Sequence, residues 1–102
     1  MRPINRILLL CLLNAPFVYG QLYSIEGKIK SIDSPLAFAN VLIKSAEKGT
    51  VADEKGAYKL EGLTSGIYIL EVSFTGYISV QKEIQITDQN RNIDFQLGQI
   101  RF

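Results

Sequence analysis

The chain has 102 residues, of which 47% are hydrophobic, and a formal charge of +1 at pH 7. This length suits one small domain, the hydrophobic content excludes a disordered chain, and the weak charge provides no field for nucleic acid. The sequence has no histidine, and its single cysteine is Cys11. It therefore lacks the residues for Ser/His/Asp or Cys/His catalysis and for an ordinary zinc site, so we expect no enzyme, cofactor or metal.

Residues 1–20 have the pattern of a secretory signal peptide. The segment has a basic start, an apolar run and small residues before a cleavage point, which are Arg2 and Arg6, residues 7–13, and Val18 and Gly20. We expect cleavage to leave Gln21 as the new N-terminus. The mature chain would then carry a formal charge of −1, because the two arginines take the total down from +1.

Two alternatives to a cleaved signal fit this segment less well. A membrane anchor needs roughly 20 apolar residues, and the apolar run is well short of that length. A lipoprotein signal places its cysteine after a small-residue box, whereas Cys11 lies within the apolar run. Cleavage would remove Cys11, so the exported domain must be stabilised without disulfides.

Alternating apolar and polar side chains predict half-buried strands at residues 22–30 and 38–44. The rows expected to face the core are Tyr23, Ile25, Gly27 and Ile29 in the first strand and Ala39, Val41 and Ile43 in the second. A glycine inside a strand indicates a bulge or the close approach of another backbone segment, so we expect one of these at Gly27.

Residues 49–63 read as two short strands around the turn Asp53-Glu54-Lys55-Gly56. An aspartate at the first turn position accepts hydrogen bonds from later N–H groups, and a glycine at the last position adopts positive φ without strain. This is the chemistry of a type I turn closed by a glycine bulge, which predicts a hairpin. Further structural turn glycines are expected at Gly62, Gly66 and Gly76.

Three more strands are expected after this turn, at residues 67–74, 78–87 and 92–97. The first is the most apolar and is predicted to lie in the middle of a sheet. The inward rows are Tyr68, Leu70, Val72 and Phe74 in the first, Ile78, Val80, Ile84 and Ile86 in the second with Lys82 interrupting, and Ile93, Phe95 and Leu97 in the third.

The number of strands and the short turns predict an all-β fold, an antiparallel Greek-key β-sandwich of about seven strands over residues 21–102. No helical periodicity is present after residue 20. We expect Leu70, Val72, Ile84 and Phe95 to be buried between facing sheets.

Three groups of residues could carry chemistry, and each is better explained structurally. Adjacent carboxylates at Asp53 and Glu54 suggest a glycosidase pair, but neighbouring turn residues point apart into solvent. Asp33 could join them around calcium, but the turn lacks alternating acidic ligands and Lys55 intrudes. A sugar- or peptide-binding platform could be built from aromatic residues, which we interpret mainly as core: Tyr58, Tyr68, Phe74, Tyr77 and Phe95.

The order of several short motifs resembles the carboxypeptidase regulatory-like domain. The segments that carry the resemblance are 27–29, 34–41, 49–58, 62–63, 66–68 and 74–77. They fall at the usual spacing across most of residues 25–86. Ala52 departs from the family pattern, which more often has threonine before the turn acid.

The resemblance implies a transthyretin-like β-sandwich without catalytic activity of its own. Such domains are found at the mature N-terminus of TonB-dependent outer-membrane receptors, including the SusC-like glycan importers. The resemblance therefore implies a periplasmic module of a nutrient receptor with protein partners in the plug or barrel. One alternative is a stand-alone exported binding or adhesion module for glycan or protein. Another is an accessory domain of an exported peptidase.

Overall fold

The computed structural model describes residues 21–101, so the predicted signal segment and its cleavage point lie outside the described residues. The described chain is made of strands and loops, with no helix long and apolar enough to cross a membrane. Its eight strands are β1 (Tyr23–Lys30), β2 (Asn40–Ile43), β3 (Lys48–Val51), β4 (Ala57–Leu63), β5 (Gly66–Ser73), β6 (Val80–Ile86), β7 (Arg91–Asn92) and β8 (Phe95–Gln96).

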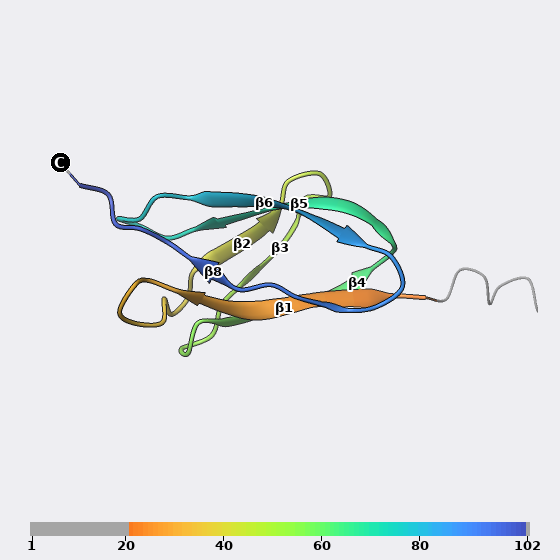
Figure 1. Ribbon diagram of the computed structural model, residues 1–102, viewed down its shortest axis with the longest axis horizontal. Helices are drawn as coiled ribbons and strands as arrows, with labels where there is room; N and C mark the ends of the chain where they lie inside the picture. Colours follow the sequence, from red (N-terminus) through yellow and green to blue (C-terminus); the bar gives the residue numbers. More distant parts are fainter. Residues whose placement is uncertain (1–20, 102) are drawn as a thin grey trace, which may run out of the picture.

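The strands form two sheets that pack face to face. One sheet has the order β4-β1-β7, with β8 also pairing with β1, and the other has the order β3-β2-β5-β6. Figure 1 shows β1 and β4 along one side of the sandwich and β5 and β6 along the other. The chain crosses between the sheets after β1, β3, β4 and β6, which is the kind of connectivity that a Greek-key sandwich requires.

The core lies between the sheets and confirms the predicted fold class. Inward-facing positions of both sheets supply it, and the four residues singled out from the sequence are at most 4% exposed: Leu70, Val72, Ile84 and Phe95. Alternation explains this, because successive strand side chains point to opposite faces. Burial of the apolar rows stabilises the sandwich by roughly 25 cal/mol for each Å² removed from water.

The predicted hairpin around Asp53 is wrong beyond its tip. Asp53 N–H donates to the Ala57 carbonyl at 2.8 Å, as in a hairpin. The arms then part, since β3 pairs with β2 and β4 pairs with β1. The turn is thus the corner at which the chain leaves one sheet for the other. The β4 arm buries Tyr58, Leu60 and Leu63, whereas the β3 arm buries no side chain and is held by its backbone ladder to β2.

One strand boundary and one inward assignment near strand ends are also wrong. The second strand begins at Asn40, and Phe38 precedes it as a loop residue with a φ of 66° and a side chain that is 61% exposed. Ile78 is 58% exposed and precedes β6, which begins at Val80. Both residues lie where the chain turns between strands, so the period-two pattern extends further than the ladder.

The last predicted strand is divided into β7 and β8, and both run parallel to β1 rather than antiparallel. In an unbroken parallel ladder, Lys28 N–H would donate to the Ile93 carbonyl. It donates instead to Asp94 Oδ1 at 2.9 Å, while Ile93 N–H still donates to the Glu26 carbonyl. A side-chain carboxylate thus replaces one main-chain acceptor.

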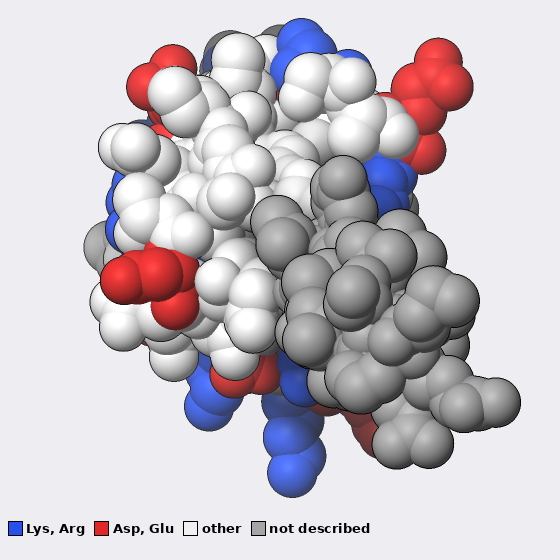
Figure 2. Space-filling model, turned by 90° about the vertical axis from the view of Figure 1, so that its right-hand side faces the viewer, with Lys and Arg blue, Asp and Glu red and all other residues white. Residues whose placement is uncertain are grey.

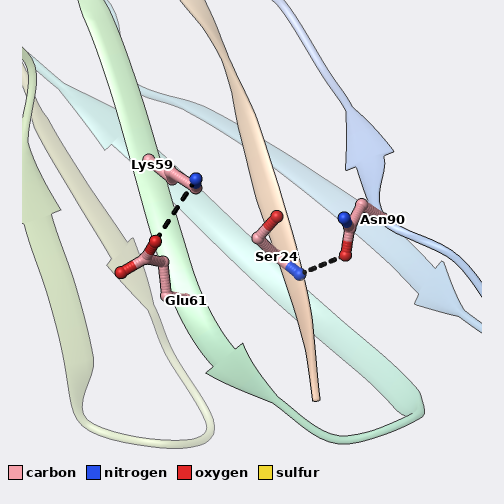
Figure 3. A network of polar contacts seen from close by, with 4 residues as sticks. All are labelled: Ser24, Lys59, Glu61 and Asn90. Atoms are coloured by element: carbon pink, nitrogen blue, oxygen red, sulfur yellow. Dashed lines mark hydrogen bonds and ion pairs between the residues drawn. The ribbon is translucent and has the colours of Figure 1, made fainter. Parts of the chain in front are cut away.

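The same substitution occurs where β7 begins. Ser24 N–H donates to Asn90 Oδ1 at 2.9 Å, again with a sequence separation of 66 residues (Figure 3). The predicted inward residues of this region are buried: Ile93, Phe95 and Leu97. Alternation was therefore informative about burial but not about strand direction.

Candidate functional site

Asp53 organises the corner between the sheets. Its Oδ1 accepts hydrogen bonds from Lys55 N–H at 2.8 Å and Ala57 N–H at 3.0 Å, and Gly56 N–H donates to its carbonyl at 3.0 Å. The bond from Ala57, then the bond from Lys55, lowers the pKa of the Asp53 carboxyl. A carboxylate committed to two backbone donors is a turn residue and is poorly placed for acid–base chemistry.

Gly56 packs closely against β1. Its φ is +78°, and an added Cβ would lie 2.4 Å from the Ile29 carbonyl oxygen. The φ values of the other three turn glycines are also positive: Gly62, Gly66 and Gly76. The first two lie at the β4–β5 crossing, and Gly76 follows β5 with open space around its missing side chain.

Gly27 is where a second backbone segment approaches β1 most closely. An added Cβ at Gly27 would lie 1.9 Å from the Ile93 carbonyl oxygen. The same oxygen accepts a 2.6 Å hydrogen bond from the buried hydroxyl of Tyr58, which is paired with Gly27 across β1 and β4. Burial, and then the nearby charge of Asp94, raises the pKa of the Tyr58 hydroxyl.

The carboxylates considered as a catalytic or calcium cluster do not assemble. Asp33 lies in the loop after β1, and no group of three or more His, Cys, Asp or Glu side chains within residues 21–101 is arranged to hold a metal ion. Glu54 is exposed beside Asp53 in the turn. The described carboxylates thus offer no ligand set for a metal ion.

The aromatic residues divide between core and rim. Tyr58 and Phe95 are buried, with ring centroids 6.1 Å apart. Tyr68, Phe74 and Tyr77 are half-buried and pack against the core, and the Tyr68 hydroxyl donates to the Thr64 carbonyl at 2.7 Å. Their packing explains them as structural residues.

The outer face of the sheet β3-β2-β5-β6 carries an apolar stripe that the sequence analysis did not single out. Its members are between 39% and 60% exposed and run diagonally across three strands: Val51, Leu42, Ile69 and Ile67. The signal was present in the sequence, since these apolar residues occupy the rows that alternation assigns to solvent. Neighbouring apolar side chains on an outer sheet face are a feature of contact surfaces.

Charged side chains make few ion pairs within residues 21–101. The one ion pair in the described chain joins Lys59 Nζ to Glu61 Oε1 at 3.3 Å, both on the exposed side of β4 (Figure 3). Figure 2 looks onto the end of the sandwich where β1 begins, and its visible surface is largely uncharged with charged groups towards the rim.

The fold and its corner turn define a small all-β module whose described residues assemble no catalytic constellation. The family model for the CarboxypepD_reg-like domain matches residues 25–100. The chain therefore belongs to the carboxypeptidase regulatory-like family, as the sequence motifs suggested. The domain type that names this family is regulatory and non-catalytic. Comparison with curated proteins gives no match.

Solved structures share the fold at low identity. A chain in the type II cohesin–X-dockerin complex of Acetivibrio cellulolyticus superposes with a TM-score of 0.65 and 15% identity, over 74% of this chain and 56% of that one. 3-Chlorocatechol 1,2-dioxygenase from Rhodococcus opacus 1CP superposes with a TM-score of 0.61 and 10% identity, over 79% of this chain and 61% of that one. The Bacillus anthracis TIE protein superposes with a TM-score of 0.59 and 18% identity, over 78% of this chain and 17% of that one. This chain thus spans little over half of the first structure, and the likeness concerns the β-sandwich alone.

Proposed function

We propose that this β-sandwich is a non-enzymatic contact module, exported to the periplasm as the N-terminal domain of a TonB-dependent outer-membrane nutrient receptor. The observation that carries the proposal is the family match over residues 25–100, since domains of this kind occur in that position in such receptors. The signal-like pattern of residues 1–20 supports export. As part of such a receptor, the domain acts by binding other protein segments.

The exposed apolar stripe supports a contact role. Leu42, Val51, Ile67 and Ile69 lie on one outer sheet face, although the opposite face of the same sheet already supplies the core. The structural likeness to a chain of a cohesin–X-dockerin complex is compatible with protein partners, as far as a shared fold goes.

Cell fractionation with an antibody raised against residues 21–101 tests the receptor context. We expect the antigen in the outer-membrane fraction, in a polypeptide much larger than 11.4 kDa, the mass of this chain. Mass spectrometry of its N-terminus should begin at Gln21. A free periplasmic species of small mass would reject the receptor and favour the second candidate, a stand-alone exported binding module.

A further inference from the structure

We propose that the apolar stripe on the outer face of the sheet β3-β2-β5-β6 binds the same stripe of a second copy of this chain, around a twofold axis that runs along it. This inference deepens the contact role proposed above, and it rests on that role only in taking the stripe as a contact surface. The stripe runs diagonally across three strands and consists of Val51, Leu42, Ile69 and Ile67. The charges beside it identify the partner.

The register of β2 and β5 places four outward side chains at the corners of a square. Leu42 is paired with Glu71, and Lys44 continues the ladder opposite Ile69, because Lys44 N–H donates to the Ile69 carbonyl at 3.0 Å. Residues two apart on a strand share a face, so all four corners lie on the outer side of the sheet. One diagonal of the square, from Leu42 to Ile69, is therefore apolar. The other diagonal carries opposite charges at its two ends.

The charges of Lys44 and Glu71 are not neutralised by an ion pair within residues 21–101. The ion pair of this part of the chain joins Lys59 to Glu61 on β4, in the other sheet. Glu71 is half-buried, and its Oε2 accepts a 3.1 Å hydrogen bond from the neutral amide of Gln81. This bond holds the carboxylate on the outer face beside the stripe and leaves its charge uncompensated.

A twofold axis along the apolar diagonal makes this face complementary to itself. Rotation about the axis lays the stripe of one copy over the stripe of the other and exchanges the two charged flanks. Lys44 of each copy then lies opposite Glu71 of the other, so the pair forms two equivalent ion pairs around an apolar centre. Symmetric contacts of this kind require a self-complementary patch, and complementary charges fix their register. A partner with charge of one sign would leave one flank facing a like charge.

The size of the face indicates a weak, reversible dimer. Strands lie about 4.8 Å apart and rise about 3.3 Å per residue, so the four strands present roughly 400 Å² of sheet. Stable complexes bury about 800 Å² on each partner. We therefore expect a dissociation constant on the order of 0.1–1 mM, as in transient contacts.

Sedimentation equilibrium of the purified protein up to about 2 mM tests the proposal, with charge reversal as the probe. Lys44→Glu and Glu71→Lys should each weaken the dimer by at least about tenfold, because like charges would face each other twice. The double variant should dimerise within about threefold of wild type, and so should an equimolar mixture of the two single variants, since both restore opposite charges across the axis. Glu26→Lys, exposed on the outer face of the other sheet, is the matched control and should leave the dimer unchanged.

A second variant tests the apolar centre independently of charge. Ile69→Thr keeps a β-branched side chain on β5 and should weaken the dimer by at least about threefold, because it removes apolar area from the contact. Wild-type protein that stays monomeric up to about 2 mM would overturn the proposal and favour a different protein as the occupant of the stripe. Failure of both the double variant and the mixture to dimerise, or equal weakening by Glu26→Lys, would overturn it as well. These results would leave the fractionation test of the receptor unaffected, since that test does not depend on self-association.

Discussion

The hydroxyl of Tyr58 on β4 reaches over Gly27 on β1 to the carbonyl of Ile93, at 2.6 Å. The glycine makes this contact feasible, because any side chain at position 27 would occupy the place of that carbonyl. The turned carbonyl leaves Lys28 N–H to be satisfied by the carboxylate of Asp94. These contacts join β4, β1 and the segment between β7 and β8.

Tyr58→Phe should destabilise the domain by about 1–3 kcal/mol, because the buried Ile93 carbonyl loses its hydroxyl donor. The matched control is Tyr68→Phe, which removes the hydrogen bond to the exposed Thr64 carbonyl. Water can replace that donor, so the control should lose at most about 0.5–1 kcal/mol. Urea denaturation of wild type and both variants measures the free energy of unfolding. Equal losses in the two variants would show that the buried hydrogen bond of Tyr58 contributes no more than the exposed bond of Tyr68.

Alkaline pH should destabilise the domain through the same hydroxyl. The pKa of Tyr58 is raised in the folded state by burial. Its contribution to stability is therefore complete below the unfolded-state pKa of about 10, and it is lost as the pH rises above that value, because the unfolded tyrosine ionises more readily. The free energy of unfolding should fall less steeply above pH 10 in Tyr58→Phe than in wild type. Equal slopes of the free energy of unfolding against pH in wild type and Tyr58→Phe would contradict the assignment of this pH dependence to the Tyr58 hydroxyl.

Gly27→Ala should be among the most damaging single changes in the described chain. The new Cβ would meet the Ile93 carbonyl at 1.9 Å, a backbone atom that cannot move without breaking the pairing of β7 and β8 with β1. We expect a loss of about 3 kcal/mol or more, at or beyond the upper end for overpacking. Gly98→Ala is the control, since a Cβ there meets nothing within 4 Å. Thermal melts that place both variants at the wild-type midpoint would exclude the close approach.

Backbone strain and steric clash can be measured separately at two of the turn glycines. Gly56 and Gly76 both have positive φ, but an added Cβ would collide with the Ile29 carbonyl only at Gly56. Gly76→Ala should cost about 1 kcal/mol from backbone strain, and Gly56→Val about 1–3 kcal/mol or more. Chemical denaturation curves measure both. A smaller loss for Gly56→Val than for Gly76→Ala would mean that the Ile29 contact is absent in solution.

The lowered pKa of Asp53 gives the opposite pH dependence to that of Tyr58. A depressed carboxyl pKa contributes stability above its unfolded value, and the contribution is lost as the pH falls through the folded value. Asp53→Asn should therefore flatten the loss of thermal stability on acidification below about pH 4. Melting temperatures across that range provide the test, and an unchanged acid slope would mean that the carboxylate does not hold the turn.

How far the sequence predicted this structure depends on the kind of interaction. Leu70 and Ile84 were assigned to the core correctly, because period-two alternation is local and burial dominates the energetics. The divergence of β3 from β4 could not be predicted, since the turn chemistry of Asp53 and Gly56 is the same in a hairpin and in a corner. Strand partners are decided by long-range packing, which short patterns do not encode.

The candidate contact surface was only partly visible in the sequence. Val51 and Leu42 could have been noticed as apolar residues in solvent-facing rows.

Core and surface positions on the same sheet should respond very differently to truncation. Leu70→Ala should cost about 2–5 kcal/mol, because it leaves a cavity between the sheets. Glu83→Ala on β6 should stay within about 0.5 kcal/mol, since the side chain is exposed. Equilibrium unfolding in urea compares the two, and similar losses would mean that the strand faces are assigned wrongly.

Site-specific photocross-linking in intact cells tests most directly whether this domain acts by contact at the outer membrane. A photoreactive phenylalanine analogue is placed at Val51 in the exposed apolar stripe, and in a control at Glu26, which is exposed on the outer face of the other sheet. The account predicts a discrete adduct in the outer-membrane fraction from Val51 and none from Glu26. Adducts of equal yield from both positions, or none from Val51 although the protein reaches the outer membrane, would contradict it.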